Sequence, residues 1–82
     1  MTKMRNSFVA LDASAIGAAL AECRQRAGMT QQQAADAMGV SCSVWGDLER
    51  GRREPLPSTI RRAFAAVGAD AELAIRAARR KK

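Results

Sequence analysis

The sequence predicts a small all-α domain of four to five helices, and three observations lead to this fold class. The chain has 82 residues, which is enough for one domain with a thin core. Apolar residues recur at spacings of three and four over several stretches, as in amphipathic helices. Each of these stretches is followed by a glycine, the residue that most often ends a helix. Only residues 71–77 depart from the pattern, and they leave a C-terminal β-strand open as an alternative.

The first expected helix covers Ala13–Ala27, and Gly28 ends it. Asp12 or Ser14 can cap its first turn with a side-chain oxygen. Its apolar face consists of residues four, three and four apart, namely Ile16, Leu20, Cys23 and Ala27. Ahead of it, residues 1–13 form a polar, basic arm that contains a short apolar segment made of Phe8, Val9 and Leu11.

Two short helices, 31–38 and 42–50, lie at the centre of the sequence and are joined by a tight turn. Thr30 and Gln33 have the capping-box spacing, in which a hydroxyl and an amide bond reciprocally to backbone N–H groups. Gly39 ends the first helix, and Ser41 can cap the second. Two helices of this length, with a glycine-containing turn between them, fit a helix-turn-helix unit.

Helices of about eight residues are not stable alone in water, so this pair requires a packed apolar seam. Six residues can supply the seam: Ala34, Ala35, Met38, Val40, Trp45 and Leu48. With the seam inward, the second helix presents the opposite set outward: Cys42, Ser43, Gly46, Asp47 and Arg50. An exposed helix of this kind is what recognition in the DNA major groove requires.

The segment after this pair is a proline-containing basic loop followed by a further helix. Arg50, Arg52 and Arg53 crowd at the end of the exposed helix. They fit phosphate contacts that position a protein on DNA, with a merely solvated basic loop as the alternative. The next helix is expected over 58–67, before Gly68.

The C-terminal end has a different period. Over residues 71–77, Leu73, Ile75 and Ala77 alternate with more polar positions, which favours a strand, although the alanines favour a helical extension. A lone strand needs a partner, and the same strand of a second subunit would supply one, so Leu73 and Ile75 are the expected dimer residues. The basic tail 79–82 is expected either to be disordered or to contact DNA.

The net charge and the small number of cysteines and histidines limit the functions that the sequence allows. Fourteen basic and eight acidic residues give a net charge of +6, which points to a polyanion such as double-stranded DNA, with an acidic membrane surface or simple solubility as alternatives. No apolar run of about 18 residues and no signal peptide is evident, so we expect a cytoplasmic protein. With two cysteines and no histidine, no metal, cofactor or enzymatic reaction is expected. Cys42 is expected to be a surface thiol, with a redox role as the alternative.

Arg24 and Glu49 form a further candidate pair. Arg24 borders the apolar face of the first helix, and Glu49 lies on the inner side of the exposed helix. We expect them to form a partly buried, bidentate ion pair; two independent surface charges are the alternative.

Residues 14–68 resemble the phage repressor/Cro (XRE) helix-turn-helix family. The residues that carry the resemblance are Arg24, Gly28, Met29, Thr30, Gln31, Ala35, Gly39, Val40, Ser41, Leu48, Glu49, Gly51 and Pro55. The resemblance implies a lambda-repressor-like DNA-binding domain in which the third helix contacts DNA. It implies a phosphate contact from Gln31, the Arg24–Glu49 pair, and base-facing positions at Cys42, Ser43, Gly46 and Asp47.

The sequence departs from the family pattern at the seam and on the exposed helix. Ala34 stands where leucine is usual, and Trp45 stands where isoleucine or valine is usual. None of the base-facing positions carries a Gln, Asn or Arg, the long side chains that discriminate bases best. Sequence recognition is therefore expected to depend on DNA shape, or on Arg50 reaching a guanine.

The two ends are similar to those of HipB-type antitoxins, in which terminal strands form an intersubunit sheet. This narrower resemblance implies a homodimer that binds an operator palindrome and a kinase-like toxin. We therefore expect residues 1–13 to be an arm, 14–68 the DNA-binding domain, and 69–82 a dimerisation strand and basic tail. The expected function is a sequence-specific repressor that autoregulates a toxin–antitoxin operon. A phage or restriction–modification regulator, or a module that mainly neutralises a toxin, is the alternative.

Overall fold

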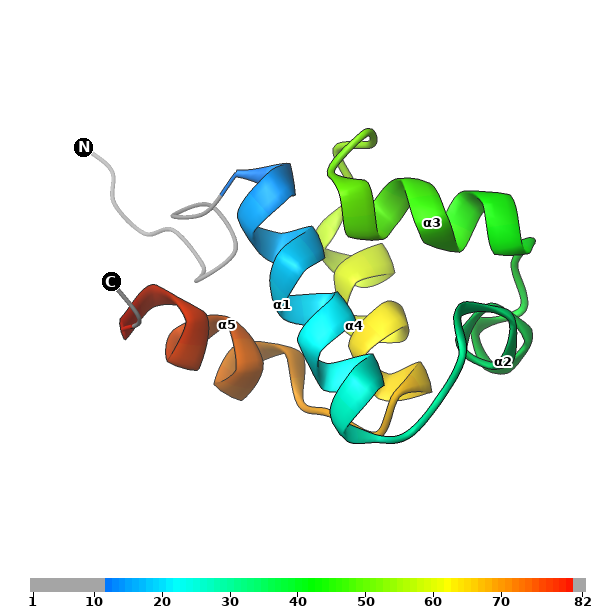
Figure 1. Cartoon of the computed structure of the whole chain (residues 1–82). Helices are drawn as coiled ribbons and strands as arrows, with labels where there is room; N and C mark the ends of the chain where they lie inside the picture. The colour runs from blue at the N-terminus through cyan, green and yellow to red at the C-terminus, as the bar shows by residue number, and fades with distance from the viewer. Residues whose placement is uncertain (1–11, 81–82) are drawn as a thin grey trace.

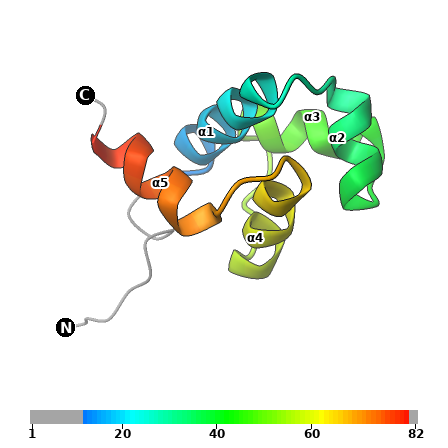
Figure 2. The same cartoon turned by 90° about the horizontal axis from the view of Figure 1, so that it is seen from below.

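The structure is a computed structural model that describes residues 12–80, and the side chains of residues 12–78. Its helices are α1 (Ala13–Arg26), α2 (Gln31–Met38), α3 (Cys42–Arg50), α4 (Pro57–Ala66) and α5 (Ala71–Arg80). α2 and α3 lie together at one end of the molecule, α5 lies at the other, and α1 and α4 lie between them (Figures 1 and 2). No strand occurs in residues 12–80. The all-α prediction is therefore confirmed, with the larger of the two expected helix numbers.

Local capping fixes the bounds of α2 and α3. The Thr30 hydroxyl accepts a hydrogen bond from the N–H of Gln33, whose side chain accepts one from the N–H of Thr30, so the capping box is complete. Gly39 follows in the left-handed conformation, with φ of 83°, which glycine adopts without steric cost. The Ser41 hydroxyl accepts from the N–H of Val44 and begins α3. Both helices have the bounds that the sequence predicts.

The two longer helices begin and end within one residue of their expected positions. Asp12 caps α1, because its Oδ1 accepts a hydrogen bond of 2.8 Å from the N–H of Ala15. α4 begins at Pro57, one residue before the expected start, since proline lacks the N–H that the first turn of a helix leaves unpaired anyway.

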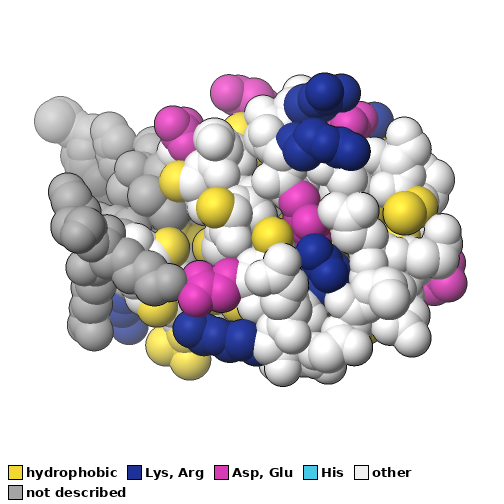
Figure 3. Space-filling model, viewed as in Figure 1, with side chains coloured by type: hydrophobic (Ala, Val, Ile, Leu, Met, Phe, Trp, Pro, Cys, Tyr) yellow, Lys and Arg dark blue, Asp and Glu magenta, His cyan; other side chains and the backbone are white. Residues whose placement is uncertain are grey.

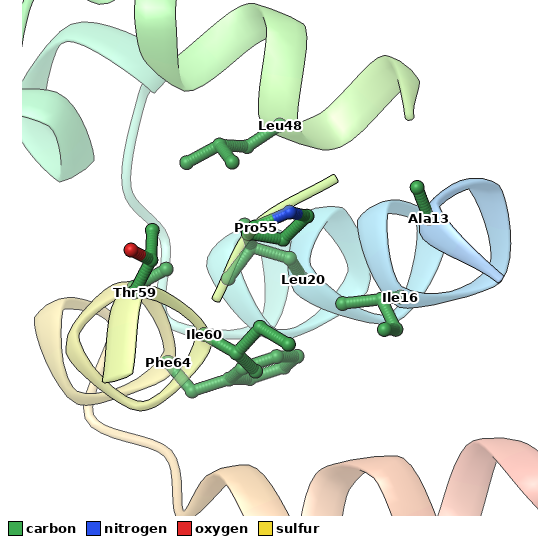
Figure 4. Close-up of a pocket in the computed structure, with 9 residues that line it drawn as sticks. Ala13, Ile16, Leu20, Leu48, Pro55, Thr59, Ile60 and Phe64 are labelled. Carbon is green, nitrogen blue, oxygen red and sulfur yellow. The ribbon is translucent and has the colours of Figure 1, made fainter. Parts of the chain in front are cut away.

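The core lies where α1, α3 and α4 meet. α1 packs on α3, α4 and α5, and α2 packs on α3 and α4. Trp45 and Phe64 are the largest fully buried side chains of this core besides Ile75. Figure 4 shows side chains from α1, α3, α4 and the loop before α4 converging on one apolar pocket: Ala13, Ile16, Leu20, Leu48, Pro55, Thr59, Ile60 and Phe64. Ala34, which is smaller than the usual leucine, and Trp45, which is larger than the usual isoleucine or valine, are both fully buried. They lie in the same core.

The expectation of a strand over residues 71–77 is wrong, because these residues lie in α5. The Asp70 carboxylate accepts a hydrogen bond of 3.0 Å from the N–H of Leu73, as an N-cap residue does. Ala71 and Ile75, four apart, are buried in the core. These residues form a helix because a helix buries one of its faces against α1 and α4, whereas an isolated strand would have no partner.

α5 therefore separates the two residues that the sequence assigned to a dimer strand. Ile75 has no exposed surface and belongs to the core of its own chain, whereas Leu73 is 62% exposed. Residues 1–11 of the expected arm 1–13, and residues 81–82 of the tail, lie outside the described part, while Asp12 caps α1 and Ala13 begins it. Among the helices of the described part, none is long and apolar enough to cross a membrane.

Candidate nucleic-acid interface

The outward side of α3 is the candidate interface. Ser43 and Arg50 are exposed, while Cys42 and Asp47 are partly exposed. Trp45 and Leu48 are buried on the opposite side. The helix therefore has one face in the core and one face uncovered by the described residues, as the sequence predicts.

Gly46 is the exception among the expected base-facing residues, because it is buried. The side chain of Arg50 covers it. A Cβ atom at position 46 would lie 2.8 Å from Nη1 of Arg50 and 3.5 Å from its Cζ. Side chains on a helix lean toward its N-terminus, so a residue four positions later covers the backbone at a position without a side chain. The surface at position 46 is thus made of guanidinium rather than open backbone.

Asp47 lies between two arginines. Its Oδ1 is 3.7 Å from Nη1 of Arg50, and its Oδ2 is 3.5 Å from Nε of Arg53. The arginine side chains are about half exposed, and ion pairs in such positions contribute little stability. Both carboxylate oxygens of Asp47 nevertheless have a cationic neighbour, which the expectation of a base-facing position did not include. The spacing of three between Asp47 and Arg50 was the available signal.

The inner side of α3 is anchored by the carboxylate of Glu49. Nε and Nη2 of Arg24 donate to its two oxygens at 2.6 and 3.3 Å, so Arg24 and Glu49 form a bidentate ion pair. The indole N–H of Trp45 donates to Oε2 at 2.6 Å, and the amide of Gln31 donates to Oε1 at 2.8 Å. The Arg24 and Glu49 side chains are only 13% and 7% exposed. One carboxylate thus connects α1, α2 and α3, which fixes the direction of the exposed face.

This network determines the ionisation of Glu49. Burial by itself raises the pKa of Glu49, because it disfavours the charged carboxylate. The hydrogen bonds from Arg24, Gln31 and Trp45, together with the positive charge of Arg24, have the opposite and larger combined effect. The pKa of Glu49 therefore lies below its ordinary value, and the carboxylate is ionised at neutral pH.

The remaining residues predicted to contact phosphates differ in exposure. Gln31 is partly buried and donates to Glu49, so its amide belongs to the anchor as well as to the surface. Arg52 and Arg53 are exposed in the loop after α3. Figure 3 shows a group of basic side chains at the top of the view, over the end of α3 and this loop. The basic residues and the exposed face of α3 therefore adjoin one another.

Chemical groups for metal binding do not gather in the described residues: no three Cys, Asp or Glu side chains there could hold a metal ion together. Cys23 and Cys42 are both partly exposed and form no disulfide. The arrangement can therefore present hydrogen-bond donors and positive charge to a ligand.

The helix-turn-helix domain family matches residues 15–77, more than half of the chain. The chain belongs to this family. α2, the turn at Gly39 and α3 are its helix-turn-helix unit, and the resemblance to the phage repressor/Cro (XRE) helix-turn-helix family is confirmed.

Two solved structures are similar to this chain. Both are crystal structures of the clp gene regulator ClgR from Corynebacterium glutamicum, and both are 33% identical to this chain. The first has a TM-score of 0.78 and covers 84% of this chain and 90% of its own. The second has a TM-score of 0.77 and covers 84% of this chain and 73% of its own. No curated protein matches the chain.

Proposed function

We propose that this protein is a DNA-binding transcriptional regulator that places α3 in the major groove of double-stranded DNA. The observation that carries the proposal is the geometry of α3, whose inner face is anchored through Glu49 and whose outer face is uncovered beside exposed arginines. Membership of the helix-turn-helix family supports it, as does the likeness to a gene regulator of about the same size. The mechanism is occupancy of DNA without a chemical step.

The roles of the side chains follow from their positions. Ser43 is exposed on the first turn of α3 and can hydrogen-bond a base edge, and Cys42 beside it can contact a thymine methyl group. Arg52 and Arg53 border the groove and contact phosphates, which positions the protein without selecting a sequence. Gln31 lies at the start of α2, and its amide nitrogen donates one N–H to Glu49. The second N–H of the same amide can donate to a phosphate.

We propose further that the protein acts as a homodimeric repressor. A nine-residue helix contacts only a few base pairs, and two copies related by a two-fold axis would double this number on a palindrome. A dimer bound across its own promoter would exclude polymerase. Leu73 on α5, an exposed leucine, is the residue we assign to this contact.

The antitoxin interpretation stays a prediction with less support, because the C-terminal strand that suggested it is a helix. If the protein does neutralise a kinase-like toxin, a second chain will co-purify with it from its native cell in constant proportion. Purification of the regulator alone, at native expression level, would leave a phage or restriction–modification regulator as the better description.

The proposed function is tested by selecting duplexes from a random pool with the purified full chain. We expect enrichment of a palindrome with half-sites centred about 34 Å apart, or a multiple of this distance. Binding to the selected duplex is then measured against salt concentration for Arg52→Ala and for the control Arg26→Ala, which removes the same charge from an exposed site on α1. Arg52→Ala should reduce the slope of log affinity against log salt by about one unit, and Arg26→Ala should not. A pool that stays random after repeated selection would refute the proposed function.

A further inference from the structure

The outward stripe of α3 has a gap at its centre that a single side chain fills. Residues 43, 46 or 47, and 50 lie on one side of a helix, and the middle position is a glycine. The guanidinium of Arg50 lies against this glycine, with Nη1, Nη2 and Cζ within 2.8 to 3.5 Å of the place of a Cβ atom. Arg50 belongs to the last residues of α3, yet its charged group lies at the middle of the helix.

Asp47 borders the same group from one side. Its Oδ1 is 3.7 Å from Nη1 of Arg50, and its Oδ2 faces Arg53. Asp47 is about one quarter exposed, so part of its acceptor surface is turned away from solvent. Asp47 therefore restricts the positions that the guanidinium of Arg50 can adopt. Because its oxygens face Arg50 and Arg53, Asp47 is poorly placed to accept a hydrogen bond from a cytosine amino group.

The guanidinium keeps its donors for a ligand. It has five N–H groups in a planar fork, and its only ion pair among the described residues, to Asp47, is longer than a hydrogen bond. The side chain is 55% exposed. The two terminal nitrogens of Arg50 are nearer the Cβ position of Gly46 than Cζ is, at 2.8 and 3.3 Å against 3.5 Å, so the end of the guanidinium lies over mid-helix. That part of α3 faces the floor of a groove in which the helix is seated, whereas phosphates line the edges. Guanine is the base that offers two acceptors, O6 and N7, on its major-groove edge.

We propose that Arg50 is the guanine-recognising residue of this protein, that Gly46 provides the space in which its guanidinium lies, and that Asp47 is its positioning residue. The proposal rests on the proposed function and adds its base specificity. Of the two roles that the sequence left open for Arg50, a phosphate contact or a guanine contact, it selects the guanine contact, and it replaces the assignment of Asp47 and Gly46 to bases. The base-facing position that looks empty in the sequence is occupied from one turn further along the helix.

The test uses the palindrome selected by the full-length wild-type chain and a copy in which one conserved guanine is 7-deazaguanine. This base lacks the N7 acceptor and leaves every phosphate unchanged. We expect the wild-type protein to bind the deaza duplex about tenfold more weakly at one guanine of each half-site. Arg50→Ala should bind both duplexes with equal affinity. In a double-mutant cycle, this result assigns the tenfold loss to the contact between Arg50 and N7 of the replaced guanine. Arg52→Ala, the control, should lose affinity for both duplexes by the same factor and keep the tenfold difference.

Gly46→Ala tests the space separately from the arginine. The added methyl group meets the end of a flexible side chain, so the variant should fold with an unchanged or higher melting temperature while its guanidinium is displaced. We expect it to lose the preference for guanine over 7-deazaguanine, although Arg50 is still present. The proposal is overturned if Arg50→Ala keeps the wild-type penalty at every guanine, or if Gly46→Ala keeps the full tenfold preference. Failure of the wild-type chain to select any duplex would instead refute the proposed function itself.

Discussion

At the scale of single residues, the carboxylate of Glu49 joins three other side chains. It accepts hydrogen bonds from Arg24, Gln31 and Trp45, side chains that come from all three helices around it. Removing one member of a nearly buried ion pair leaves the other charge without compensation, which costs more than the pair contributes when intact. Glu49 therefore determines both the stability of the domain and the orientation of α3.

Glu49→Gln should lower the free energy of unfolding by about 2 kcal/mol at pH 7, since the amide keeps the shape but not the charge. Urea denaturation followed by the fluorescence of Trp45, the only tryptophan, measures it. The control is Glu22→Gln on α1, where the pair with Arg26 is exposed and should change stability by less than about 0.5 kcal/mol. Equal losses in the two variants would contradict the role of Glu49.

The lowered pKa of Glu49 gives this stabilisation a pH dependence of known sign. The folded protein binds the proton of Glu49 less readily than the unfolded chain does, so the contribution is complete above the ordinary pKa of 4.5. It is lost as the pH falls through the lower folded-state value. The stability difference between wild type and Glu49→Gln should therefore shrink below pH 4.5. A difference that stays constant down to pH 2.5 would show that Glu49 acts by packing alone.

At the scale of helices, the sequence predicted the local capping of α2 and α3 but not the packing of α5. α2 and α3 were predicted to the residue, because Thr30, Gly39 and Ser41 act through the backbone of their own turn. α5 was ambiguous, because alternation at Leu73 and Ile75 satisfies a strand as well as a helix. Its burial against α1 decided the outcome, and Asp70, whose carboxylate caps the helix, was a local signal that the sequence interpretation did not use. The exposed face of α3 was likewise predicted, but the cover that Arg50 provides over Gly46 was not.

Gly17 lets the backbone of α1 lie close to the backbone of α3. A Cβ atom there would lie 2.4 Å from the backbone oxygens of Leu48 and Glu49. Backbone cannot turn aside as a side chain can, so Gly17→Ala should destabilise the domain by about 1–3 kcal/mol despite the better helix propensity of alanine. Gly46→Ala is the matched control, because its close neighbour is a side-chain end, and it should not lower the melting temperature. Similar thermal denaturation curves for the two variants would rule out the backbone contact.

α5 should behave as part of the folded domain. Ile75 is fully buried, so Ile75→Ala should cost about 3 kcal/mol, a large part of the stability of a small domain. Leu73→Ala, two residues away on the exposed side, should change stability by less than about 0.5 kcal/mol. Chemical denaturation of the two variants measures the difference. A neutral Ile75→Ala would mean that α5 is not packed on the core.

At the scale of the whole molecule, the two surfaces to which we propose a function, on α3 and on α5, lie apart from each other. In Figure 1, α3 and the loop after it lie along the top of the view, and α5 lies at the lower left. A contact between copies through α5 would therefore leave both α3 helices free for DNA. The net charge of +6 opposes such a contact between two copies, so self-association needs an apolar element.

Leu73 is the exposed leucine of α5, and its replacement tests whether a dimer forms there. Leu73→Glu should shift sedimentation of the protein toward the monomer and weaken binding to a palindrome far more than binding to a single half-site. Since Leu73 is 62% exposed, the helix content and melting temperature should stay unchanged. Leu56→Glu is the matched control, because Leu56 is 68% exposed and directly precedes α4 rather than lying on α5. It should leave the sedimentation coefficient as in wild type. If Leu73→Glu sediments as the wild type does while both still bind the palindrome, the two copies meet through another surface or only on DNA.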